Sequence, residues 1–146
     1  MSASNAFETN LLLLILNNTN IANIGDATGL RGSSAAGSVY VALHTADPGE
    51  AGAQNTSEAT YTGYARVAVA RSAAGWTVAS GAFSNFAAIT FGACSAGSNT
   101  ITHFSIGSSS SGAGDLLLSG ALSASLAVTT GITPVFNAGQ LTGTAD

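Results

Sequence analysis

The stretch Val39-Tyr40-Val41-Ala42-Leu43-His44-Thr45 decides the fold. Its aliphatic side chains alternate with others, so that valine, valine and leucine share one face and tyrosine, alanine and histidine share the other. A period of two over seven residues predicts a half-buried β-strand. Ala46-Asp47-Pro48-Gly49 follows with turn chemistry, because proline fixes φ and glycine accepts a positive φ.

Similar short runs continue through the rest of the chain, at intervals of roughly 8–14 residues with Gly/Ser/Asn-rich turns between them. We expect strands over 64–71, 75–78, 88–91, 100–106, 115–119, 124–129, 133–136 and 140–144. Pro134 should lie at a strand start or on an edge, because proline cannot donate to a ladder. The pattern predicts an all-β fold, an antiparallel β-sandwich that is jelly-roll-like and has eight or nine strands.

The N-terminal segment predicts the one helix. Asn5 can cap it, with Glu8 three residues on. One apolar face is formed at helical spacing by Phe7, Leu11, Leu14 and Ile15, and Leu12, Leu13 and Leu16 extend it almost around the circumference. Two interpretations stay open: the helix packs on the domain's own sheet, or it is an arm that docks on a partner. The predicted division is therefore an N-terminal helix and extended connector over 1–37 and a β-sandwich domain over 38–146.

Charge is scarce in this chain. The charged residues are three arginines and seven acidic residues, and there is no lysine. They make up 7% of the 146 residues, whereas about 25% of a typical domain is charged. Three arginines cannot neutralise a phosphate track, and a net charge of −4 disfavours an anionic membrane, so we expect neither nucleic acid nor membrane as a partner. A surface this neutral favours coverage by other protein, which indicates an assembly component.

The apolar run over 11–16 is too short to span a bilayer, which needs roughly 20 residues. Since Glu8 precedes it and no cation does, a secretory signal is not expected, and the sequence predicts a product made in the host cytoplasm.

No residues combine into a predicted active site. His44, Asp47 and Glu50 are spaced by three, but Pro48-Gly49 breaks any helix that could gather them. His103 lies in a predicted strand and Cys94 is best explained as a small buried hydrophobe. The glycine- and serine-rich run 108–115 lacks the lysine of a phosphate-binding loop. The sequence therefore predicts no enzyme, no catalytic residues, no metal and no cofactor.

The aromatic residues allow two interpretations. Tyr61, Tyr64 and Trp76 could stack on sugars or a partner, or they could complete the core with a polar tip in water. In the strand predicted over 64–71 we expect Val67 and Val69 to point inward and the two arginines, Arg66 and Arg71, outward.

Five strings together resemble a family of small tailed-bacteriophage virion proteins. They are LHTADPG over 43–49, YTGYARVAV over 61–69, THFSIG over 102–107, GDLLLSGAL over 114–122 and GITP over 131–134. Members of this group look like capsid decoration (cement) proteins, and some similar sequences are labelled tail or tail-fibre proteins. The resemblance covers about residues 38–144 and implies a jelly-roll-like sandwich that oligomerises on the exterior of an icosahedral capsid. It supplies no catalytic residues.

The sequence thus predicts a structural virion protein that stabilises a phage capsid by bridging subunits of the major capsid protein, located on the capsid exterior. The alternative is a tail-associated receptor- or carbohydrate-binding module. We expect the chain to be a homo-oligomer, a dimer or a trimer. The candidate contacts with the capsid or with other copies are Phe7, Leu11, Leu12, Leu14, Ile15, Tyr61, Tyr64 and Arg66.

Overall fold

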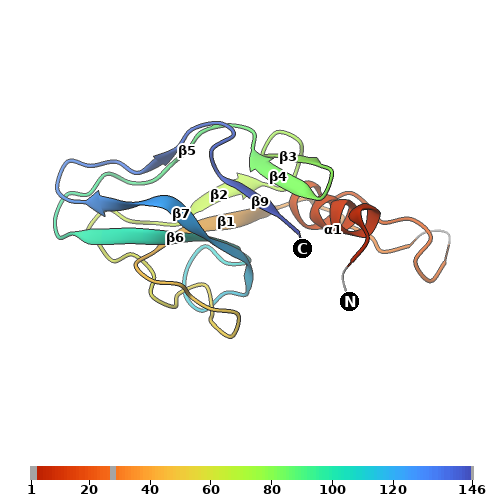
Figure 1. Cartoon of the computed structure of the whole chain (residues 1–146), viewed down its shortest axis with the longest axis horizontal. Helices are drawn as coiled ribbons and strands as arrows, with labels where there is room; N and C mark the ends of the chain where they lie inside the picture. Colours follow the sequence, from red (N-terminus) through yellow and green to blue (C-terminus); the bar gives the residue numbers. More distant parts are fainter. Residues whose placement is uncertain (1–2, 27–28, 146) are drawn as a thin grey trace. The chain divides into compact units, whose positions relative to one another are not determined.

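A computed structural model describes residues 3–26 and 29–145 of the chain (Figure 1). The chain groups into two compact units. Unit 1 comprises residues 1–38, 70–89 and 136–146, and unit 2 comprises residues 39–69 and 90–135. That residues 38–146 form a domain separate from residues 1–37 stays a prediction.

Helix α1 (Asn5–Asn17) begins unit 1. Its N-cap is Ser4, whose hydroxyl accepts from the Phe7 amide at 3.3 Å, so the cap lies one residue before the predicted Asn5. Asn18 ends the helix in the left-handed conformation, which asparagine tolerates better than most residues. The helix contacts β3 (Trp76–Ala79) and β4 (Ala82–Asn85) of the same unit.

The sheet of unit 1 has the order β3-β4-β9 and is antiparallel throughout, with β9 spanning Thr142–Thr144. Trp76 is fully buried and meets Phe83 edge to face, with ring centroids 5.8 Å apart. This aromatic pair and the buried leucines of α1, Leu12 and Leu16, form the core of unit 1. The helix thus packs on a sheet of its own chain, which was the first of the two interpretations.

The main sheet of unit 2 has the order β2-β1-β6-β7. Its strands are β1 (Ser38–His44), β2 (Val67–Ala70), β6 (Asn99–Gly107) and β7 (Leu116–Val128). Strand β1 pairs antiparallel with β6 from Tyr40 opposite Gly107 to His44 opposite His103. Val41, Leu43, Ile101 and Ile106 are almost completely buried, so the stretch that predicted the fold supplies the centre of this core.

Strands β5 (Ile89–Thr90) and β8 (Val135–Phe136) form a two-stranded sheet. Pro134 directly precedes β8, which confirms its predicted place at a strand start. Nine strands lie within the described residues, and the predicted fold class, an all-β antiparallel β-sandwich with one short N-terminal helix, is confirmed. The jelly-roll-like arrangement of the strands stays a prediction.

Candidate functional site

The first set of predicted contact residues lies on helix α1, and the structure divides it. Leu12 is 1% exposed and points into unit 1 together with Leu16. Phe7 is 42% exposed, and Leu11, Leu14 and Ile15 are half-buried. Leu14 lies midway between Leu12 and Leu16 in sequence and therefore on the opposite side of a helix with 3.6 residues per turn. Leu12 is therefore excluded as a surface contact.

We call Phe7, Leu11, Leu14 and Ile15 the outer stripe of α1. Arg71 holds this stripe in place at the C-terminal end of the helix. Its Nε donates to the carbonyl of Ile15 at 2.6 Å and its Nη2 to that of Leu14 at 2.8 Å. The last turn has no basic residue of its own, so Arg71 supplies the cation that the helix dipole favours there.

A second contact fixes the N-terminal half of α1. Thr9 Oγ1 accepts from the Gly81 amide at 2.6 Å, which joins the helix to the turn between β3 and β4. The helix is therefore held within unit 1 both at Thr9 and in its last turn. The outer stripe is a fixed apolar surface, since its orientation does not depend on a partner.

The second set of predicted contact residues surrounds Arg66. The expectation that Arg66 points outward is wrong, because the side chain is 1% exposed. Its Nε donates to Glu58 Oε1 at 2.7 Å and its Nη2 to Glu58 Oε2 at 2.8 Å, a bidentate ion pair. Strand β2 begins only at Val67, so Arg66 lies outside the alternation that would have turned it to solvent. The sequence prediction failed because the strand is shorter than expected.

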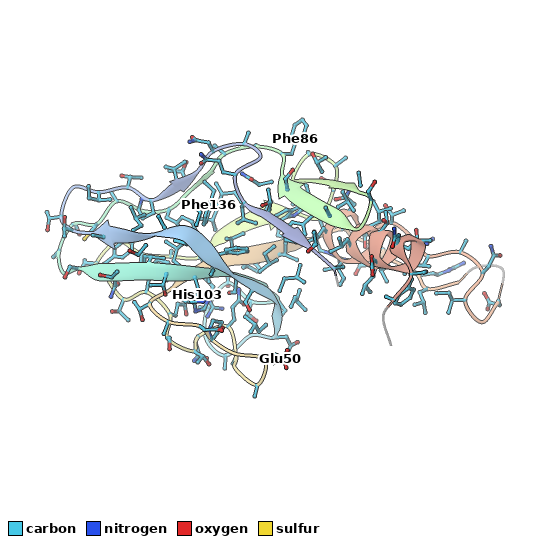
Figure 2. All side chains as sticks on the ribbon, viewed as in Figure 1. Glu50, Phe86, His103 and Phe136 are labelled. Atoms are coloured by element: carbon cyan, nitrogen blue, oxygen red, sulfur yellow. The ribbon has the colours of Figure 1, made fainter. Side chains whose placement is uncertain are left out.

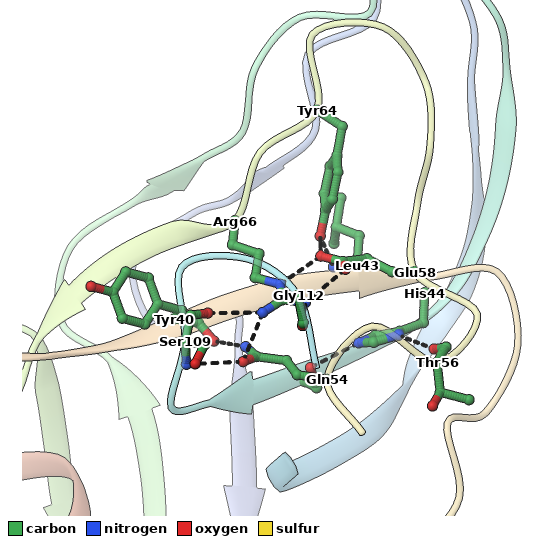
Figure 3. A network of polar contacts seen from close by, with 11 residues as sticks. Tyr40, Leu43, His44, Gln54, Thr56, Glu58, Tyr64, Arg66, Ser109 and Gly112 are labelled. Carbon is green, nitrogen blue, oxygen red and sulfur yellow. Dashed lines mark hydrogen bonds and ion pairs between the residues drawn. The ribbon is translucent and has the colours of Figure 1, made fainter. Parts of the chain in front are cut away.

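The remaining donors of Arg66 bind two loops, as Figure 3 shows. Nη1 donates to Gln54 Oε1 at 3.1 Å and to the Ser109 carbonyl at 2.9 Å, and Nη2 donates to the Gly112 carbonyl at 2.6 Å. All five N–H groups of the guanidinium are thus used. The hydrogen bond to Glu58 raises the pKa of Arg66, in opposition to the effect of burial. Arg66 therefore fixes the loop over residues 45–66 and the loop over 108–115 relative to each other.

Tyr64 and Tyr61 support the same arrangement from inside unit 2. The Tyr64 hydroxyl accepts from the Leu43 amide at 3.0 Å and donates to Glu58 Oε1 at 2.9 Å. Burial raises the pKa of Tyr64 far above its usual value. Tyr61 is 3% exposed and donates to the Gly92 carbonyl at 3.0 Å. Both hydroxyls are therefore used inside the chain; Tyr61 is buried, whereas Tyr64 remains half-buried.

The interpretation in which aromatic side chains stack on a sugar is therefore wrong for Trp76 and Tyr61. Trp76 is completely buried and Tyr61 nearly so, which leaves the core interpretation for both. The exposed aromatic side chains in the described residues include Phe86, at 60%, which projects from unit 1 (Figure 2), and Phe7 of the outer stripe.

His44 and Ser105 form a buried pair that resembles part of a catalytic dyad. His44 Nε2 lies 2.8 Å from Ser105 Oγ, and Nδ1 lies 2.8 Å from the Thr56 carbonyl. The carbonyl can only accept, so Nδ1 carries the proton and Nε2 accepts from the serine. Both side chains are 0% exposed, and burial lowers the pKa of His44. A substrate cannot reach this serine in the folded chain, so the pair serves to join β1 to β6.

Two buried amides were missed in the sequence. Gln54 joins the Tyr40 carbonyl, through Nε2 at 2.8 Å, to the Arg66 network. In unit 1, Asn85 accepts from the Leu141 amide at 2.9 Å and donates to the carbonyl of Asn137 at 2.9 Å. Polar side chains in predicted turns carry no sequence signal for burial, so only the three-dimensional structure identifies these anchors.

Within residues 3–26 and 29–145, no group of three or more His, Cys, Asp or Glu side chains is placed to hold a metal ion. Cys94 is a free, buried thiol. No helix among residues 3–26 and 29–145 is long and apolar enough to cross a membrane.

Comparison with known proteins gives one family. Residues 2–144 match the family model described as podophage GP4 fiber I protein gp80. None of the curated proteins matches the chain. The family match covers nearly all of the sequence, including α1 and both units. It indicates a structural protein of the bacteriophage virion, which agrees with the coarser part of the sequence prediction.

Proposed function

Because this chain belongs to the family of podophage GP4 fiber I protein gp80, we propose that it is a non-catalytic structural subunit of the virion's fibre apparatus. The match over residues 2–144 is the observation that carries this proposal, since the family description names a fibre protein. The proposal moves the expected location from the capsid exterior to the fibre and retains the assembly role.

The distribution of charge supports an assembly role. Two of the three arginines serve the interior: Arg66 is buried in the ion pair with Glu58, and Arg71 is bound to the last turn of α1. Arg31 is exposed. The surface is thus even less charged than the composition indicated. Contacts made by such a surface depend little on ionic screening, so subunits should stay attached at high salt.

The outer stripe of α1 is the surface we assign to contacts with neighbouring virion proteins. Its side chains are aliphatic or aromatic and partly exposed, although unit 1 already has a core without them. Burial of apolar area stabilises association by about 25 cal/mol per Å² before the entropic cost of binding. Many identical copies along a fibre would multiply a modest contact through avidity.

Two variants test this assignment. Phe7→Ser combined with Leu14→Ser should leave the unfolding temperature of the purified chain nearly unchanged but reduce its incorporation into virions severalfold. Asn10→Ser, at an exposed position of the same helix, is the matched control and should incorporate normally. Normal incorporation of the Phe7/Leu14 variant would remove the stripe from the proposal without touching the fibre location.

Location itself is tested by gold-labelled antibodies against this chain on purified virions. Label on the fibres supports the proposal. Label spread over the capsid in hundreds of copies would favour the second candidate, a decoration protein that bridges major capsid protein subunits. That candidate is retained because five strings of the β region resemble capsid decoration proteins. Its physical basis would be mass-action linkage, in which a protein that binds the assembled shell stabilises it.

A further inference from the structure

The four-stranded sheet of unit 2 ends in β7, and this terminal strand has an unusual composition. Strand β7 spans 13 residues, Leu116–Val128, whereas β2 at the other end of the sheet spans only four, Val67–Ala70. A terminal strand presents backbone N–H and C=O groups that can pair with another strand. Proteins commonly protect such edges with short strands, lysine, proline or inward-pointing charges.

Strand β7 has none of the side chains that protect an edge. From Leu116 to Ala145 the sequence contains no charged residue, no lysine and no histidine, and its one proline, Pro134, lies outside the strand. Leu117 is 40% exposed and Leu126 is 36% exposed. The short strand β2 is flanked by two arginines, so the two edges of the sheet differ in character.

The register of β7 limits where another strand can pair. Residues 118–121 pair regularly with β6, from Leu118 opposite Ile106 to Ala121 opposite His103. The ladder shifts on both sides of this segment: one extra residue, Leu117, lies before it, and residues 122–125 follow between the pairs of Ala121 and Leu126. Bulges of this kind twist an edge away from a partner. The regular, accessible part of the edge is therefore Leu118–Ala121.

We propose that β7 pairs antiparallel with β7 of a second copy of this chain, about a twofold axis, so that the two four-stranded sheets become continuous. The occupant is a second copy because the pairing surface is uncharged on both sides and is self-complementary. In a twofold antiparallel pair centred on Ser119, each Ser119 faces its equivalent, and Leu118 of one copy lies opposite Gly120 of the other.

This inference rests on the proposed function, because a fibre subunit is present in many neighbouring copies. Its test uses the isolated full chain, however, so the result does not depend on where the protein lies in the virion. If pairing fails, the fibre assignment stands, and if the fibre assignment fails, the pairing can still be measured.

The experiment is sedimentation velocity of the purified chain over a range of concentrations. We expect a reversible dimer with twice the monomer mass of 14.2 kDa. Ser119→Lys places two like charges opposite each other and should raise the dissociation constant about tenfold or more. Ala68→Lys, also at an exposed position but on the β2 edge, is the matched control and should leave the dissociation constant unchanged.

A wild-type chain that stays monomeric at every concentration overturns the proposal. The proposal is also overturned if Ser119→Lys leaves the dissociation constant unchanged, or if Ala68→Lys raises it. In either case the dimer would use another surface. If Ser119→Lys fails to fold, Ser119→Cys replaces it as the test. Since Cys94 is buried, the introduced thiol alone should form a disulfide-linked dimer on mild oxidation, and a chain that stays monomeric under those conditions overturns the proposal.

Discussion

The substitution Glu58→Gln tests whether the Arg66 network fixes the two loops of unit 2. The substitution keeps the shape of the side chain but removes the negative charge that Arg66 contacts through Nε at 2.7 Å and Nη2 at 2.8 Å. The Arg66 side chain is 1% exposed and that of Glu58 is 17% exposed, so water can only partly replace the lost carboxylate. Removing one partner of a buried ion pair costs about 3–5 kcal/mol. The residual exposure of Glu58 places our expectation at the lower end, about 3 kcal/mol.

The assay is equilibrium unfolding in urea, followed by far-UV circular dichroism. Trp76 fluorescence is recorded in parallel and reports on unit 1, because the single tryptophan lies in β3. Glu50→Gln, which removes an exposed acid from the same long loop, is the matched control and should change the free energy of unfolding by less than about 0.5 kcal/mol. The double variant Glu58→Gln/Arg66→Met should be more stable than Glu58→Gln alone, because no unpaired charge remains buried.

Equal costs for Glu58→Gln and Glu50→Gln would refute the reasoning. The ion pair would then contribute no more than an exposed charge, and the loops over 45–66 and 108–115 would have to be held by other contacts.

Three further predictions concern single residues. Because burial lowers the pKa of His44 below 6.5, the folded chain binds fewer protons than the unfolded chain, so stability should fall as pH drops through 6.5. This one group can contribute at most about 1.4 kcal/mol per pH unit, and His44→Gln should flatten the slope of the unfolding free energy between pH 6.5 and 5. Arg71→Met should cost about 1–3 kcal/mol, read by Trp76 fluorescence in urea, since two carbonyls of the last turn of α1 lose their donor; an unchanged midpoint would contradict that anchoring role. Gly107→Ala should lower the unfolding temperature by several degrees, because its Cβ would approach the Asp115 carbonyl oxygen to 2.6 Å and press on Gln54; a stable variant would show that the loop moves freely.

The alternation over Val39–Thr45 is enough to predict a central strand, because a period of two can be recognised from the order of neighbouring residues alone. Strand β4 was not predicted, because Ala82–Asn85 is short and carries no strong strand-forming pattern. Two predicted strands, 115–119 and 124–129, are one strand in the structure. The irregular segment 122–125 overlaps the start of the second predicted strand, and residues 120–123 separate the two predictions.

The candidate contact residues show a different limit of sequence reasoning. Helix α1 is apolar almost all round, so periodicity could not decide which side faces its own sheet; packing selected Leu12 and Leu16 and left Phe7 and Leu14 outside. The outward prediction for Arg66 rests on a strand over 64–71, whereas β2 begins only at Val67. The partners of Arg66, which are Glu58, Gln54, Ser109 and Gly112, lie up to 46 residues away, a distance at which a single sequence shows no pairing.

A cryo-electron microscopy map of the complete virion tests the central claim most directly. The account predicts density for this chain within the fibre apparatus, with the outer stripe of α1 covered by a neighbouring protein. Density on the capsid shell, or a fibre subunit in which Phe7 and Leu14 face solvent, would contradict it.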